Sequence, residues 1–124
     1  MDINDSEPEI DFDHLNQYVG GDISLTKEIF GLFKNQVDIW AKQLQADADD
    51  EIWSAVTHSL KGSARAIGAM KLAQACENAE SLVGEGRKLS ARQVAVDTLE
   101  IRIDRATIEI GRWEYRQTMN AMRS

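Results

Sequence analysis

The sequence predicts an all-α protein, an up-and-down antiparallel four-helix bundle with a short additional N-terminal helix. Three observations lead to this prediction. The only proline is Pro8, so no predicted helix interior contains one. Apolar residues recur three or four positions apart over long stretches, whereas β-branched alternation never persists. Glycines and acidic clusters divide the chain into segments with short connections, which favour antiparallel neighbours.

The first two helices are bounded by acidic caps and glycines. Asp11 or Asp13 can cap a short helix that runs to Tyr18. The pair Gly20-Gly21 then ends it. A long amphipathic helix follows and stops before the acidic cluster at residues 47–50.

Three more helices are predicted after this cluster. The third covers about residues 51–67 and the fourth about 70–83, each followed by a glycine. Ser90 can cap the last and longest helix, in which apolar residues recur as far as Trp113. The tryptophans are expected in the core, at positions 40, 53 and 113.

The length of 124 residues fits one domain. We expect residues 1–10 to form an acidic, disordered leader and residues 11–124 to form a single helical domain. No apolar stretch approaches the ~20 residues that span a bilayer. The N-terminus lacks the features of a secretion signal, and Cys76 is the only cysteine. We therefore expect a soluble, cytoplasmic protein that binds no membrane. We also expect a monomer, although nothing in the sequence fixes the oligomeric state.

The net charge of -7 argues against nucleic acid as the main partner. Seven acidic residues and no Lys or Arg lie in residues 1–26. The rest of the chain holds fourteen acidic and fourteen basic residues and is neutral. This distribution is compatible with a protein partner of either positive or negative net charge.

His58 lies on the third predicted helix, on the side away from its apolar stripe. With ~100° per residue and His58 at zero, the stripe centres on about 160°. We expect it to contain five residues, Ile52, Val56, Leu60, Ser63 and Ile67. Arg65 falls at about -20°, Gly62 at about +40° and Lys61 at about -60°. The imidazole is therefore predicted to be exposed, with two cations and a glycine beside it.

This arrangement suits phosphoryl transfer to a histidine. A glycine inside a helix costs ~1 kcal/mol relative to alanine, and Gly62 would clear space for an incoming acyl phosphate. Lys61 and Arg65 can neutralise the phosphoryl oxygens. A histidine is partly neutral near cytoplasmic pH and then has one nucleophilic nitrogen. An exposed histidine is nevertheless often an ordinary surface residue.

Glu80 is the candidate for orienting the imidazole. It falls at the edge of the apolar stripe of the fourth helix, from where a carboxylate can reach a neighbouring helix. The position also suits an ordinary solvated glutamate. Cys76 lies within the stripe and is expected in the core. His14 has no candidate partners around it, and the chain offers no metal-ligand spacing.

The segment His58-Ser59-Leu60-Lys61-Gly62-Ser63, followed by Gly68-Ala69, Leu72, Cys76 and Glu80, resembles the signature of histidine-containing phosphotransfer (HPt) domains. The resemblance covers roughly residues 11–115 and is weak after Gly84. It implies that His58 is phosphorylated, that Lys61 attends the phosphoryl group and that Gly62 gives access. It also implies that Glu80 hydrogen-bonds the ring, whereas Arg65 occupies a variable position.

The resemblance further implies a carrier rather than an enzyme. His58 would accept a phosphoryl group from a receiver-domain aspartate and pass it to another, in two-component signal transduction. The expected partners are receiver domains of response regulators or hybrid histidine kinases. The chain itself would bind no cofactor and use no ATP. The Mg²⁺ would be bound by the receiver domain.

Two alternatives remain at this point. One is a helical adaptor with the same bundle and no phosphoryl chemistry, in which replacing His58 would have no effect. The other is an enzyme that acts alone through a histidine nucleophile. No second acid-base group accompanies His58 at an evident spacing, which disfavours this alternative.

Overall fold

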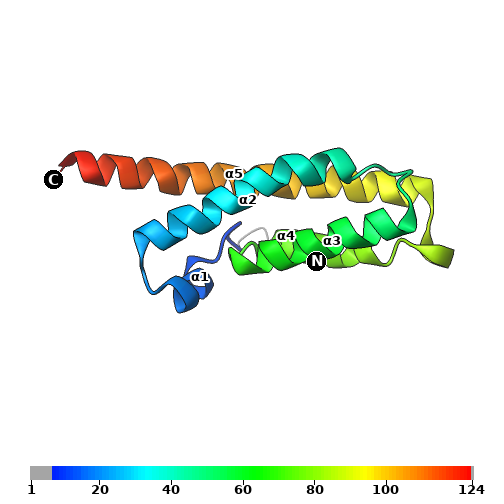
Figure 1. Cartoon of the computed structure of the whole chain (residues 1–124), viewed down its shortest axis with the longest axis horizontal. Helices are drawn as coiled ribbons and strands as arrows, with labels where there is room; N and C mark the ends of the chain where they lie inside the picture. The colour runs from blue at the N-terminus through cyan, green and yellow to red at the C-terminus, as the bar shows by residue number, and fades with distance from the viewer. Residues whose placement is uncertain (1–6, 124) are drawn as a thin grey trace.

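The computed structural model describes residues 7–123, and every regular element among them is helical. The elements are α1 (Phe12–Val19), α2 (Ile23–Gln43), α3 (Asp50–Ala66), α4 (Met70–Glu80), the 3-10 turn η1 (Gly84–Gly86) and α5 (Leu89–Arg123). Helices α2 to α5 run up and down, and α5 projects past the others at its C-terminal end (Figure 1). The predicted all-α bundle with a short N-terminal helix is confirmed. No described helix has the length and apolar character that crossing a membrane requires.

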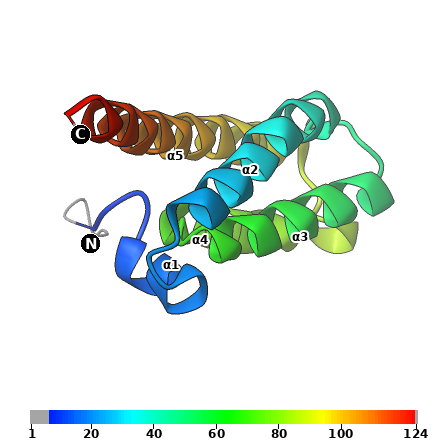
Figure 2. The ribbon, with the colours of Figure 1, turned by 60° about the vertical axis from the view of Figure 1, so that its left-hand side comes forward.

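The four long helices are packed in a ring. Helix α3 packs against α2 and α4, and α5 packs against the same two helices. Helices α3 and α5 therefore lie at opposite corners of the bundle (Figure 2).

Helix α1 lies across one end of the bundle, beside the turn between α3 and α4 (Figure 2). Its N-cap is Asp11, whose carboxylate accepts a hydrogen bond from the backbone N–H of His14 at 3.1 Å. The backbone N–H of Asp11 also donates to the carbonyl of Gly68 at 2.8 Å. Gly68 has a φ of 79°, and a Cβ there would lie 2.6 Å from the Asp11 carbonyl oxygen. Only glycine permits this approach.

Aromatic side chains fill much of the core, as expected for the three tryptophans. Phe30 of α2 meets Trp113 of α5 edge to face, with ring centroids 5.3 Å apart. The indole N–H of Trp53 donates to the carbonyl of Ala79 at 2.8 Å, which ties α3 to the end of α4. Contacts of this kind fix how the helices are rotated relative to one another.

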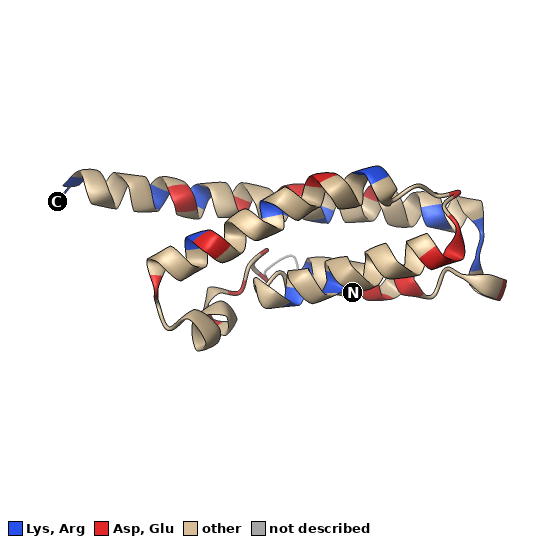
Figure 3. Cartoon of the chain, in the orientation of Figure 1, with Lys and Arg blue, Asp and Glu red and all other residues tan. Residues whose placement is uncertain are grey.

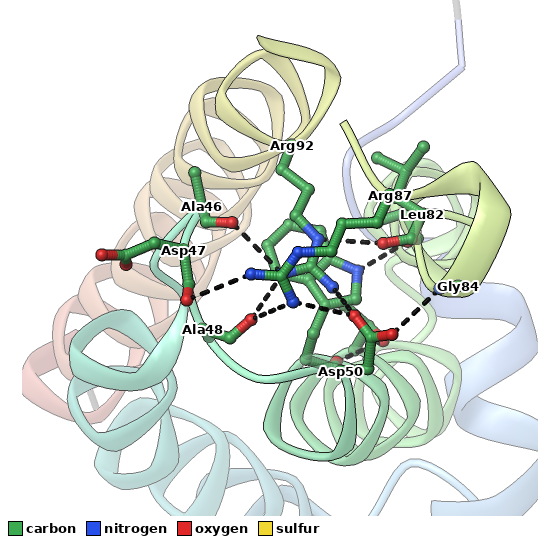
Figure 4. A network of polar contacts seen from close by, with 11 residues as sticks. Ala46, Asp47, Ala48, Asp50, Leu82, Gly84, Arg87 and Arg92 are labelled. Atoms are coloured by element: carbon green, nitrogen blue, oxygen red, sulfur yellow. Dashed lines mark hydrogen bonds and ion pairs between the residues drawn. The ribbon is translucent and has the colours of Figure 1, made fainter. Parts of the chain in front are cut away.

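A buried arginine closes the other end of the bundle. Arg92 is completely buried and its guanidinium lies 4.4 Å from the ring centroid of Trp53. It donates to the Asp50 carboxylate at 2.7 Å and to three carbonyls, those of Ala46, Ala48 and Leu82 (Figure 4). Arg87 adds a second contact to Asp50 at 3.0 Å. Figure 3 shows basic residues of the α4–α5 connection beside acidic residues at the start of α3. We call this network the arginine clasp.

Two of the predicted helix boundaries differ from those in the structure. The fourth helix ends at Glu80 rather than near residue 83, because the carbonyl of Leu82 leaves the helix to accept from Arg92. The last helix begins at Leu89, so Ser90 lies inside its first turn and is not the cap.

The N-terminal part of the chain was expected to be a leader. Residues 1–6 lie outside the described residues. Ile10, which we placed in the leader, is buried in the core. Glu9 contacts Lys71 at 3.4 Å and Arg102 at 3.5 Å. These two residues therefore pack against the bundle, and the boundary at residue 11 remains a prediction.

Candidate functional site

His58 lies in the middle of α3, and its side chain is 77% exposed. The opposite face of α3 is buried and contains Trp53, Val56, Thr57, Leu60 and Ala64. Ile52 was expected in this face, but it is exposed. Trp53 is in the core instead. Its ring packs under Arg92, and its indole N–H donates a hydrogen bond to Ala79 of α4. The buried face of α3 is therefore rotated from the predicted one, so that it includes Trp53 and Thr57. His58 still points away from this face.

Glu80 lies between His58 and Lys61. One carboxylate oxygen, Oε2, lies 3.4 Å from Nδ1 of His58. The other, Oε1, accepts a hydrogen bond from Nζ of Lys61 at 2.7 Å. The contact to His58 is longer than an ordinary N–H···O hydrogen bond, whereas the contact to Lys61 is a short, charge-assisted one. Only 15% of the Lys61 side chain and 26% of the Glu80 side chain are exposed.

The hydrogen bond from Lys61 lowers the pKa of Glu80 below its ordinary value of 4.5, and a weaker lowering comes from His58. Glu80 is therefore an anion at neutral pH. An anion next to Nδ1 favours the tautomer that carries its proton there. The nucleophilic lone pair is then on Nε2, the ring nitrogen on the far side from Glu80.

Gly62 leaves open space on α3 beside His58. A Cβ at this position would meet no atom within 4 Å, so packing inside the domain does not require a glycine. An alanine would fit and would favour the helix by about 1 kcal/mol. The glycine is thus unexplained by the fold itself.

Arg65 was expected beside His58 as a second cation. Its guanidinium instead lies 3.6 Å from Oε1 of Glu77 on α4, and both side chains are about half exposed. Glu77 was not among the residues predicted for the site. Its position could have indicated this contact, because Glu77 lies one turn before Glu80 on the same edge of α4.

The remaining candidates lie elsewhere. Cys76 is completely buried, and burial together with the charge of Glu80 raises the pKa of its thiol to about 12. It is an inert core residue, as expected. His14 lies on α1 with its ring edge to face against Tyr18, at a centroid distance of 5.3 Å.

The fold and this site together define a helical bundle with an exposed histidine in the middle of one helix and a carboxylate beside its ring. The sequence model of the Hpt domain matches residues 28–109, so the chain belongs to the Hpt domain family. The structure is similar to the crystal structure of the histidine phosphotransferase ShpA from Caulobacter crescentus, with a TM-score of 0.73 and 25% sequence identity. The similarity covers 92% of this chain and 98% of that chain. No match was found among curated protein sequences.

Family membership and this structural likeness give the chain its general role. It is a phosphorelay carrier of two-component signalling.

Proposed function

We propose that His58 is the residue that carries the phosphoryl group, taking it from the aspartate of one receiver domain and passing it to the aspartate of another. The observation that carries this proposal is the contact of Nδ1 with Glu80 at 3.4 Å on an otherwise exposed ring. It leaves Nε2 directed to the partner as the nucleophile.

The transfer step follows from this orientation. The lone pair of Nε2 attacks the phosphorus of the aspartyl phosphate in line with the bond that breaks. The N–P bond forms as the P–O bond breaks, and the aspartate leaves as a carboxylate. The proton stays on Nδ1. The positive charge that the ring gains is then balanced by the Glu80 carboxylate. Transfer to the second receiver domain reverses these changes.

The neighbouring residues have distinct proposed roles. Lys61 holds Glu80 in place in the free domain. Its ammonium contacts the same carboxylate as His58, and we assign it to attracting phosphoryl oxygens as well. Gly62 keeps the approach to the ring open, because nothing in the domain fills the space beside it. Arg65 contacts Glu77, so we assign it to the rim of the docking surface rather than to the phosphoryl group.

The partner supplies the rest of the chemistry. Receiver domains of response regulators or hybrid histidine kinases would provide the aspartate and the Mg²⁺ that neutralises the phosphoryl oxygens. This chain provides a positioned nucleophile and no ATP-dependent kinase activity of its own. The side chain of His58 on α3 is 77% exposed. A receiver domain can therefore cover it directly.

The test is phosphorylation by a phosphorylated receiver domain, followed by mass spectrometry under non-acidic conditions. We expect one added phosphoryl group, lost in acid and absent in His58→Gln. His14→Gln is the matched control, because it removes the other histidine, and it should be labelled normally. Labelling that persists in His58→Gln contradicts the assignment. An unlabelled wild-type chain across several receiver domains would favour the adaptor alternative.

A further inference from the structure

Small side chains line the exposed face of α3 around His58. On a helical projection with His58 at zero, Ser54 falls at about -40°, Ala55 at about +60° and Gly62 at about +40°. All three residues are exposed. Ser54 lies one turn before His58 and Gly62 lies one turn after it. A partner can therefore come close to the backbone of α3 along this face.

Two charged side chains lie at the ends of this face, each seven residues from His58. Glu51 falls at about +20° and Arg65 at about -20°, so both are nearly in line with the imidazole. Both residues are exposed. Seven residues rise about 10.5 Å along a helix, which places the acid and the base about 21 Å apart with His58 midway between them. We call Glu51, His58 and Arg65 the acceptor line.

The two charges of the acceptor line are not needed for the fold. Arg65 lies 3.6 Å from Glu77, beyond ordinary hydrogen-bond distance, and both side chains are about half exposed. An exposed ion pair of this kind contributes little to stability. Glu51 forms no ion pair with any residue in the range 7–123, and the arginines near it contact Asp50 instead. Both charges can therefore turn to a partner at little cost.

The other charged residues of α3 are already engaged within the domain. Asp50 belongs to the arginine clasp. The ammonium of Lys61 lies 2.7 Å from Glu80, and the Lys61 side chain is only 15% exposed. Glu51 and Arg65 are therefore the charges that α3 offers most readily to a partner at His58.

The helix dipole accounts for the signs of these charges but not for their alignment. An acid in the first turn of a helix and a base in the last turn are favourable on any side of that helix. The dipole does not require either residue to be in line with His58. Their equal spacing on the two sides of the imidazole is therefore a separate feature, and it concerns whatever docks there.

A receiver domain centred on His58 would cover both charges. A standard protein–protein interface takes about 800 Å² from each partner, which corresponds to a disc of about 16 Å radius. Glu51 and Arg65 lie about 10.5 Å to either side of His58, within this disc. Each charge would lose water on docking, which is unfavourable unless an opposite charge on the receiver domain meets it.

We propose that Glu51 and Arg65 select the receiver domain and fix its direction along α3. The receiver surface that fits carries a basic side chain opposite Glu51 and an acidic side chain opposite Arg65, about 21 Å apart. A receiver domain turned end over end would bring like charges together at both ends of the acceptor line. This inference rests on the proposed function, because it takes His58 as the centre of the docking surface.

The test is the initial rate of transfer from a phosphorylated receiver domain that loads the wild-type chain, measured over a series of receiver concentrations. The swap variant combines Glu51→Arg with Arg65→Glu and keeps the net charge. At low ionic strength we expect its half-saturating receiver concentration to rise about tenfold, with the maximal rate unchanged. The rise should shrink in high salt, because exposed charges are then screened.

The matched control combines Glu100→Arg with Arg105→Glu on α5, where both positions are exposed and lie on the helix diagonal to α3. It should leave the half-saturating concentration unchanged. A swap variant that saturates like the wild-type chain, or no better and no worse than the control, overturns the proposal. A swap variant that loses maximal rate alone also overturns it. A wild-type chain that no receiver domain labels would contradict the proposed function and this inference together, so the two failures are distinct.

Discussion

Oε2 of Glu80 lies 3.4 Å from Nδ1 of His58. The two side chains come from different helices, α3 and α4, and Trp53 fixes these helices through its hydrogen bond to Ala79, the residue before Glu80. The position of the carboxylate is thus determined by core packing and by Lys61, and not by the exposed histidine. The ring can turn toward a partner while Glu80 stays in place.

Replacing Glu80 by glutamine should slow phosphoryl transfer about tenfold, because the neutral amide balances the charge on the ring less well. The measurement is the rate of transfer from a phosphorylated receiver domain. Glu77→Gln is the control, since it changes the same helix one turn earlier and contacts Arg65 instead. Equal transfer rates for the two variants would show that Glu80 has no specific role in phosphoryl transfer.

Replacing Lys61 by alanine should raise the pKa of Glu80 back toward 4.5, because Lys61 is the largest cause of its lowering. Transfer should weaken without being eliminated. The carboxyl resonance of Glu80, followed by NMR over an acid titration, measures the change. Lys71→Ala, which affects the contact with Glu9, should leave the resonance unaltered.

Gly62 offers a test in which stability and function change in opposite directions. Gly62→Ala should stabilise the domain by about 1 kcal/mol, and Gly62→Gln should slow transfer with little loss of stability. Gly31→Ala is the control, because Gly31 also lies inside a helix with no atom near a Cβ. It should stabilise without affecting transfer. A Gly62→Gln variant that transfers at the normal rate would contradict the access role.

Removing the arginine of the clasp should destabilise the whole domain. Arg92→Met leaves the carbonyls of Ala46 and Leu82 without their donor, whereas the carbonyl of Ala48 keeps Arg87. We expect a loss of about 3 kcal/mol or more in the free energy of unfolding. Urea unfolding measures it. Labelling of His58 should persist wherever the variant is folded, because the clasp lies at the end of the bundle. Arg105→Met, at an exposed position, should have a small effect.

The loss of folding stability at acidic pH should depend in part on Asp50. Its pKa lies below the ordinary 3.8, first because the backbone N–H of Gly84 donates to it and then because of Arg87. A lowered pKa means that its contribution is complete above the unfolded value and is lost as the pH falls below about 4. Asp50→Asn should therefore weaken the pH dependence there. Thermal unfolding from neutral to acidic pH tests this, and an unaltered acid limb would count against it.

The helices and the position of His58 could be predicted because they depend on local features of the sequence. Asp11 caps α1 through a side chain three residues from its partner, and the exposed side of α3 follows from simple periodicity. The exposure of Ile52 could not be predicted in this way. It depends on Trp53, whose contacts with Arg92 and Ala79 are made by residues far apart in the sequence.

The members of the candidate site and the contact between His58 and Glu80 were predictable, but the ion pairs of the two cations were not. His58, Lys61 and Glu80 do lie together. However, Lys61 and Arg65 were both predicted to neutralise the phosphoryl oxygens, and in the free domain they contact Glu80 and Glu77. Which carboxylate a flexible cation meets depends on the rotation of α4 relative to α3. That rotation follows from tertiary packing and has no local signal.

Helix α5 lies diagonally across the bundle from α3, which carries His58. A receiver domain that covers the exposed side of α3 would therefore leave the outer face of α5 in contact with solvent. A fluorescent label on that outer face should leave phosphoryl transfer unaffected, so the chain could be followed while a receiver domain is bound.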